Sequence, residues 1–123
     1  MSHRTGLAAA LLIIAALAPG ARGAAQTRTT PAPDKAQLER GKAVYDQWCA
    51  ACHDPGPRHP GTQALDALYK GSKPGALEQR TDLVPKLTET FVRRGVSVMP
   101  PFRKTEITDD ELAALAAYLA PRP

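Results

Sequence analysis

The sequence predicts an all-α domain, and two of its features carry this prediction. Three segments place apolar side chains at three- and four-residue steps, the spacing that gathers them on one face of a helix. No segment beyond residue 25 alternates apolar and polar residues as a half-buried strand would. The predicted main helices run over residues 34–48, 85–94 and 108–120, with short helices in the loop between the first two.

The first main helix begins after Asp34, which stands three residues before Gln37 in the pattern of a capping box. A glycine in its interior, Gly41, costs about 1 kcal/mol relative to alanine. Either another backbone or ring packs closely there, or the glycine is incidental. The inner face of this helix would hold Leu38, Gly41, Val44, Tyr45 and Trp48.

The segment Cys49-Ala50-Ala51-Cys52-His53 follows directly after this helix. Two cysteines separated by two residues, with a histidine after the second, form the attachment signal of haem c. The thiols of Cys49 and Cys52 would form thioether bonds to the two vinyl groups of one haem, and His53 would bind the iron. A redox dithiol, a disulfide or a zinc site is the alternative, and His53 argues against the dithiol.

Prolines and glycines punctuate residues 54–73, which we expect to form a loop that wraps one side of the haem. His59 lies in this loop and is a candidate second ligand. A surface histidine is the favoured interpretation, because its neighbours are Arg58 and Pro60. The helical segments expected here are Thr62–Lys70, with Leu65, Leu68 and Tyr69 inward, and a turn within Pro74–Arg80.

The second main helix is expected over Pro85–Arg94, with proline at its first position and Gly95 past its end. Val84 is a poor N-cap, so this start is less well defined. The helix would carry an apolar stripe of Leu87, Phe91 and Val92.

An apolar segment follows Gly95 and ends in two prolines, Pro100 and Pro101, so it is expected to be extended rather than helical. It would present the Met99 sulfur on rigid backbone. A thioether is a good ligand for low-valent iron, and a Met/His ligand pair raises the reduction potential. The alternative is that Met99 fills space in the core.

The third main helix begins at Thr108, because Thr108-Asp109-Asp110-Glu111 matches the capping-box pattern, and Pro121 stops it. Alanines between the apolar positions favour close contact with another helix. We expect Tyr118 to cross the first helix near Gly41 and Tyr45. The inner face would hold Leu112, Leu115, Tyr118 and Leu119.

Residues 1–25 have the order of a cleavable secretory signal: a basic start, an apolar run from Leu7 to Leu17 and small residues before the cleavage site. The run is well short of the roughly 20 residues that span a bilayer, although a retained anchor is the alternative. Cleavage after Gly23 or Ala25 would leave a flexible leader over residues 26–33, a domain over 34–121 and no stable membrane span. The protein would then be periplasmic.

Loss of Arg4 and Arg22 with the signal leaves fourteen basic residues against twelve acidic ones, a net charge of +2 rather than +4. This balance gives no support to nucleic-acid binding. A domain of this size needs reinforcement of its core, and a covalently held haem would supply it.

With these features the chain resembles the class I c-type cytochromes. The resemblance implies a cytochrome c fold around one covalently bound haem, with His53 and Met99 as axial ligands. It also implies that the Pro60 carbonyl orients the His53 ring. Tyr69 and Arg80 are candidate contacts of the haem propionates. The matching residues are Gly41, Tyr45, the Cys49–His53 motif, Pro60-Gly61, Gly95, Met99-Pro100, Leu115 and Tyr118-Leu119.

A narrower resemblance concerns the small cytochrome subunits of bacterial flavoprotein dehydrogenases such as p-cresol methylhydroxylase. It rests on size and on the segment from Arg93 to Phe102. The family implies a carrier of single electrons, which would accept from a dehydrogenase, with a flavoprotein as one candidate, and pass to a respiratory acceptor. The basic side chains that could steer an acidic partner are Arg58, Lys70, Lys73, Lys86, Arg93, Arg94, Arg103 and Lys104.

Two other classes of function remain open from the sequence. A haem enzyme or a gas sensor would need an open or labile sixth position at the iron. A disulfide or zinc module would carry no haem at all.

Overall fold

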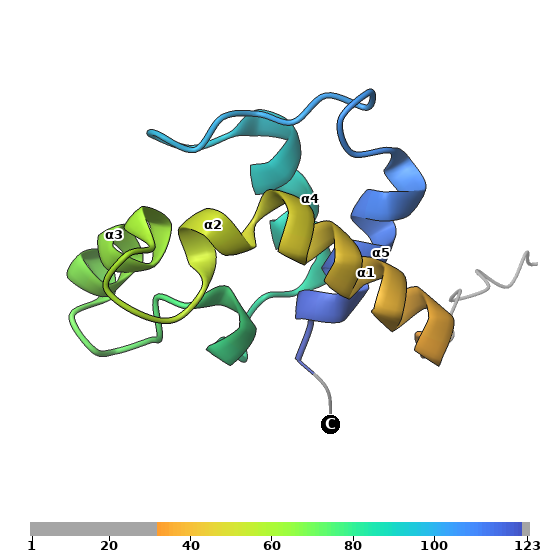
Figure 1. The fold of residues 1–123 in the computed structure, drawn as a ribbon. Coiled ribbons are helices and arrows are strands. Elements are labelled where there is room, and N and C mark those ends of the chain that lie inside the picture. Colours follow the sequence, from red (N-terminus) through yellow and green to blue (C-terminus); the bar gives the residue numbers. More distant parts are fainter. Residues whose placement is uncertain (1–31, 122–123) are drawn as a thin grey trace, which may run out of the picture. The chain divides into compact units, whose positions relative to one another are not determined.

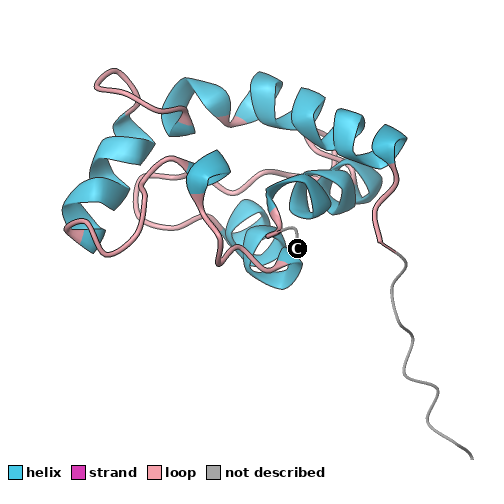
Figure 2. Ribbon diagram, turned by 90° about the horizontal axis from the view of Figure 1, so that it is seen from below, coloured by secondary structure: helices cyan, strands magenta, loops and turns pink. Residues whose placement is uncertain are grey.

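The computed structural model describes residues 32–121; the predicted signal and most of the predicted leader lie outside them. Over these residues the chain forms helices and loops and no strand, apart from one isolated bridge between Val96 and Met99 (Figure 2). The predicted all-α class is confirmed. The elements are α1 (Lys35–Trp48), α2 (Ala50–His53), α3 (Pro60–Tyr69), the 3-10 turn η1 (Leu77–Gln79), α4 (Pro85–Arg94) and α5 (Asp109–Leu119) (Figure 1).

Helices α1 and α5, from opposite ends of the described chain, lie against each other (Figure 1). A Cβ atom at Gly41 would lie 2.6 Å from the Cβ atom of Tyr118, so only glycine permits this approach. The rings of Tyr45 and Tyr118 lie beside it, with centroids 6.0 Å apart. The predicted crossing of Tyr118 over Gly41 and Tyr45 is confirmed.

Local signals fix the helix ends. The side chain of Asp34 accepts a 2.8 Å hydrogen bond from the Gln37 amide at the start of α1. At the start of α5, Thr108 and Glu111 form the predicted reciprocal capping box, with bonds of 3.2 and 2.8 Å. Helix α4 begins at Pro85 without a side-chain cap and ends at Gly95, whose φ is +67°.

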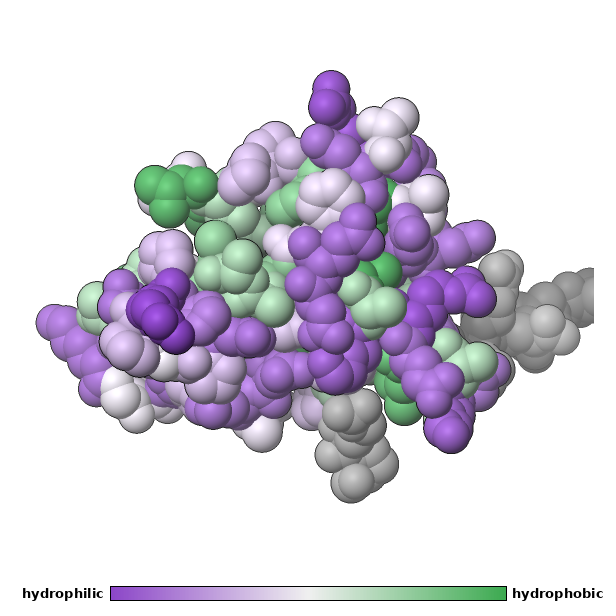
Figure 3. Space-filling view, viewed as in Figure 1, coloured by the Kyte–Doolittle hydropathy of each residue, from purple (hydrophilic) through white to green (hydrophobic). Residues whose placement is uncertain are grey.

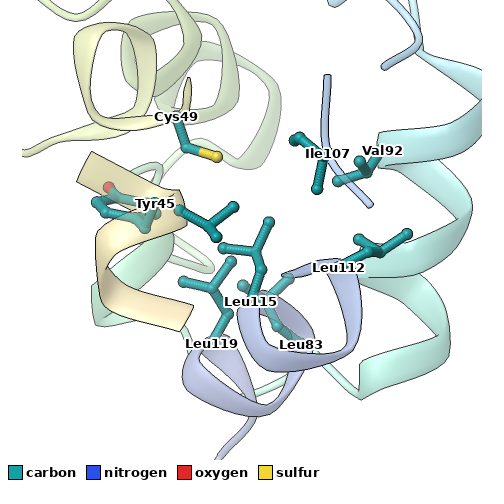
Figure 4. Close-up of a cluster of buried hydrophobic side chains, with 9 residues drawn as sticks. Tyr45, Cys49, Leu83, Val92, Ile107, Leu112, Leu115 and Leu119 are labelled. Carbon is teal, nitrogen blue, oxygen red and sulfur yellow. The ribbon is translucent and has the colours of Figure 1, made fainter. Parts of the chain in front are cut away.

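The core lies where α1, α4 and α5 meet (Figure 4). Cys49 belongs to it, and its sulfur points toward the interior (Figure 4). Leu83 and Ile107 enter the core from loops, where no periodic pattern predicts that they are buried. The complete cluster is Val44, Tyr45, Cys49, Leu83, Val92, Ile107, Leu112, Leu115 and Leu119.

Helix α3 differs from the prediction in its start and in its inner face. It begins at Pro60 rather than Thr62, because proline suits the first helical position. It packs on α2, and its one buried side chain is Thr62. Leu68, predicted to face inward, is 68% exposed, because this contact uses the opposite end of the helix.

The segment after Gly95 is also different from the prediction. Residues 96–99 form a tight turn rather than an extended strand, with Ser97 at a φ of +53°. The amide of Val96 donates to the Met99 carbonyl at 3.0 Å, and the Met99 amide donates to the Val96 carbonyl at 2.9 Å. The proline pair excludes helix, but it does not by itself impose an extended backbone on the residues before Met99.

None of the helices formed by residues 32–121 has both the length and the apolar character that crossing a bilayer requires.

Candidate functional site

The two cysteines and His53 share a single helical turn. Cys49 closes α1, since its amide donates to the Tyr45 carbonyl at 2.8 Å. It also opens α2, because its own carbonyl accepts from the amides of Cys52, at 3.0 Å, and His53, at 2.9 Å. The motif from Cys49 to His53 therefore forms one helical turn. Both thiols are free, with Cys49 buried and Cys52 exposed.

Burial controls the chemistry of the inner thiol. It raises the pKa of Cys49 to about 12. Because the thiolate is the reactive form of cysteine, burial disfavours reaction of this side chain in the closed domain. An apolar environment of this kind suits a neutral thioether.

The His53 ring is partly buried, and the backbone at Gly61 lies directly against it. Burial lowers the pKa of His53, which favours the neutral imidazole that binds metals. A Cβ atom at Gly61 would lie 2.7 Å from Cε1 and 2.9 Å from Nδ1 of this ring. Glycine at position 61 is therefore what allows α3 to close over His53.

Pro60, whose carbonyl is predicted to orient the His53 ring, lies next to Gly61 but forms no hydrogen bond to that ring. Nδ1 of His53 is buried and has no hydrogen-bond partner among the described residues. Pro60 lies one residue before Gly61, at the first position of α3. Its carbonyl does not accept from Nδ1 here, so the pairing stays a prediction.

His59 is placed differently from the surface position that we favoured. Its ring is partly buried, and Nδ1 lies 3.0 Å from the Ala50 carbonyl oxygen and 3.2 Å from that of Ala51. The loop thus folds back onto α2, between the two cysteines. Only tertiary structure reveals this contact, because nothing in the neighbouring residues indicates it.

Met99 reaches the same core as Cys49. It is partly buried and packs against the cluster that contains the Cys49 side chain. Its turn is held by the Phe102 amide, which donates to the Val92 carbonyl at 2.8 Å. The Phe102 ring also meets Trp48 edge-on, with centroids 5.8 Å apart, which ties the turn to the end of α1.

Tyr69 and Arg80, the candidate propionate contacts, are brought together. The Arg80 guanidinium lies 4.7 Å from the centre of the Tyr69 ring and is almost fully buried. It donates twice to Asp82 at 2.8 Å, and Lys73 reaches the same carboxylate at 2.5 Å. These two cations hold the pKa of Asp82 well below its usual range. Sequence reasoning did not include Asp82 in the site.

Most of the basic residues proposed to steer a partner have acidic neighbours. Lys73, Lys86, Arg93, Arg103 and Lys104 each form an ion pair. Within residues 32–121, the members of the set that form none are Arg58, Lys70 and Arg94.

The residues present fit a haem attached through α2. Two free thiols and a neutral imidazole stand on one turn, and a thioether sulfur packs against the same core. Hydrophobic side chains gather over α2 and the tip of the 96–102 segment, framed by polar ones (Figure 3). Trp48, Val96 and Val98 are among the exposed apolar residues. No group of three or more His, Cys, Asp or Glu side chains in the described part of the chain could hold a bare metal ion.

Comparison with known proteins shows the family of the chain. Residues 36–119, more than half of the chain, match the family model described as cytochrome c oxidase, cbb3-type, subunit III. Neither a curated protein nor a solved structure matches the chain. Nothing in the comparisons supports the narrower resemblance to flavocytochrome subunits. The chain therefore belongs to this family of c-type cytochrome domains, whose chemistry is haem-based electron transfer.

Proposed function

We propose that the protein is a mono-haem cytochrome c that carries single electrons between redox proteins. The observation that carries the proposal is the single turn that presents Cys49, Cys52 and His53, with Met99 packed against the core that buries Cys49. The chain contains one such motif and two cysteines in all, which supports one haem.

Each residue of the site has a separate task in this proposal. Cys49 and Cys52 would tether the porphyrin, and His53 and Met99 would bind its iron. When bound, the haem supplies an iron that alternates between the ferrous and ferric states. A Met99 turn closed by two hydrogen bonds limits movement of the thioether, so the same ligands stay in place in both states. With both axial positions taken, no substrate can reach the iron.

Arg80 and Tyr69 are proposed to meet the haem propionates. The two cations around the single Asp82 carboxylate leave a surplus positive charge in a partly buried place. A carboxylate is the ligand that a guanidinium recognises best. A hydrogen bond from the His53 ring to the Pro60 carbonyl is part of the same proposal.

The partners are proposed from charge. Arg58, Lys70 and Arg94 are exposed and form no ion pair among the described residues, so they are available to an acidic surface. A dehydrogenase, a flavoprotein among the candidates, would donate the electron, and a respiratory protein would accept it. Export through the N-terminal signal would place this exchange in the periplasm.

Expression in a host that attaches haem c tests the proposal. We expect a red protein whose haem survives denaturation and adds its mass to the chain. Met99→Ala should keep the haem attached, lower the reduction potential and let the ferrous iron bind carbon monoxide. Val84→Ala, at an exposed valine directly before α4 and outside this site, is the control and should leave both properties unchanged.

Two outcomes would contradict the proposal. A colourless wild-type product would show that the motif does not attach haem. A red wild type that readily binds carbon monoxide would keep the tether but replace the carrier with a haem enzyme or gas sensor, whose sixth position is open.

A further inference from the structure

His59 has no role in the electron-carrier function proposed above, although its side chain contacts α2. It is the residue before α3, and its carbonyl accepts the first bond of that helix, from the Gln63 amide at 3.0 Å. Its side chain turns the other way, toward α2. Because the Ala50 and Ala51 carbonyls can only accept, the Nδ1 atom between them carries a proton and donates.

The bond from His59 reaches the part of the backbone that positions the haem-binding residues. Ala50 and Ala51 stand between Cys49 and Cys52. The Ala50 carbonyl also accepts the Asp54 amide at 3.0 Å, the bond that closes α2. His59 therefore joins the start of α3 to the one turn that carries the motif.

The start of α3 in turn limits the orientation of His53. Gly61, two residues after His59, is so close that an added Cβ atom would meet the His53 ring at 2.7 Å and the Cys52 carbonyl at 2.7 Å. A small change in the spacing of α2 and α3 would thus open room beside the imidazole. The side chain of His59 bonds the start of α3 to the α2 backbone beside this contact.

The other side-chain bonds of this loop do not reach residues 50–53, and one of them ends on Asp54, the C-cap of α2. The Gln63 side chain donates to the Pro57 carbonyl, and the Thr62 hydroxyl donates to the Asp54 carbonyl at 2.9 Å. Both contacts order the loop over residues 54–63. Among residues 32–121, His59 is the one whose side chain bonds to the backbone between the cysteines.

We propose that His59 is a positioning residue, which fixes the orientation of the His53 imidazole by donating from Nδ1 to the carbonyls of Ala50 and Ala51. The inference rests on the proposed function in one respect, that His53 is an axial ligand. In the holoprotein the plane of an axial imidazole then becomes an observable, because it governs the pattern of haem-methyl shifts in the NMR spectrum of the ferric state.

His59→Ala, His59→Asn and Gln63→Ala, made in the holoprotein, test this proposal. The amide nitrogen of asparagine can take the place of Nδ1 as a donor, so His59→Asn should keep the wild-type pattern of methyl shifts. His59→Ala should change that pattern and shift the reduction potential. Gln63→Ala loosens the same loop without touching α2, and it should leave the pattern unchanged.

Hydrogen exchange gives a second readout that does not depend on the iron. In His59→Ala the Asp54 amide should exchange about tenfold faster than in wild type, the effect of one lost hydrogen bond on local opening. In His59→Asn its rate should stay near that of wild type.

The proposal is overturned if His59→Ala keeps the wild-type methyl pattern, or if His59→Asn changes it as much as alanine does. Should the alanine variant fail to fold, the asparagine variant decides alone: a wild-type pattern supports the donor role, and an altered one contradicts it. A wild type without haem would defeat the proposed function, while the exchange rates would still test the bond from His59 to α2.

Discussion

Gly41 and Ala114 mark the closest approach of α1 and α5: a Cβ atom on Gly41 would lie 2.2 Å from the Ala114 carbonyl oxygen. Real side chains do not approach a backbone oxygen so closely. Since the backbone of α5 cannot yield without moving the whole helix, the two helices can take this distance only with glycine at position 41.

Gly41→Ala should therefore destabilise the domain even though alanine is the better helix former. We expect a loss of about 2–3 kcal/mol, the usual cost of overpacking, measured by urea unfolding of the holoprotein. Ala43→Gly, at an exposed position of the same helix, measures the propensity effect alone and should cost about 1 kcal/mol. A stabilised Gly41→Ala would show that the helices do not meet there.

Gly95→Ala should disturb the Met99 turn. Gly95 has a φ of +67°, and an added Cβ atom would lie 2.6 Å from the Met99 carbonyl oxygen. Gly71→Ala is a matched control, because Gly71 has a φ of +83° and nothing within 4 Å of its Cβ position. Gly71→Ala should lose about 1 kcal/mol from backbone strain, and Gly95→Ala should lose more, because its Cβ atom would also overlap the backbone of Met99 and Pro101. Only Gly95→Ala should also weaken the methionine-to-iron charge-transfer band and bind carbon monoxide; equal spectra for the two would contradict this expectation.

Thr108→Ala removes the side-chain half of the capping box at α5, the bond that the Thr108 hydroxyl accepts from the Glu111 amide, and leaves the backbone amide of residue 108 to donate to Glu111. We expect a loss of about 1 kcal/mol, seen as a lower Tm. Thr108→Ser keeps the hydroxyl and should recover most of the stability. If serine and alanine were equally destabilised, the methyl group rather than the cap would be the cause.

Asp82 should make the domain sensitive to acid. The adjacent Arg80 and Lys73 hold the pKa of the Asp82 carboxyl below its ordinary value near 3.9. Its contribution is therefore complete above about pH 5 and is lost as the pH falls below the unfolded-state value toward the lower folded-state one. Asp82→Asn should cost about 2 kcal/mol at pH 7, because it weakens two charged hydrogen bonds to buried Arg80.

The difference between wild type and Asp82→Asn should shrink between pH 5 and pH 2 in urea titrations. Asp109 is a suitable comparison, since Lys104 and Arg93 also lower its pKa but its side chain is 63% exposed. Asp109→Asn should cost less at pH 7. A constant difference between wild type and Asp82→Asn across this range would contradict the ion pairs around Asp82.

Local chemistry made much of the fold predictable. Pro85, Gly95 and the Thr108–Glu111 box define helix ends by short-range effects, and the structure places those ends at the same residues. The Gly41–Tyr118 crossing was also accessible, since a glycine on an apolar helix face together with an alanine-rich partner helix indicates close packing. The haem motif is equally local, because its chemistry needs only the spacing of Cys49, Cys52 and His53.

Features made by distant parts of the chain were not predictable in the same way. The Met99 turn depends on its hydrogen bonds and on the packing of Gly95. The two prolines after Met99 indicate an extended backbone, so the prediction from sequence was wrong here. Leu68 has the period of an inner face, but α3 contacts α2 through Gly61 and leaves Leu68 outside. The attachment of His59 to α2 and the grouping of Tyr69 with Asp82 require the loop conformation itself.

The place of Cys49 in the core has a consequence for the proposed attachment of haem. Its side chain is covered by residues of α5, such as Leu115 and Leu119, which are the last helical residues to be made. Before α5 docks on α1, this sulfur is open to solvent and free to ionise; afterwards it is sealed in an apolar interior. If haem is attached there as proposed, bond formation at Cys49 would be chemically easiest before α1 and α5 meet, and their docking would then enclose the finished linkage.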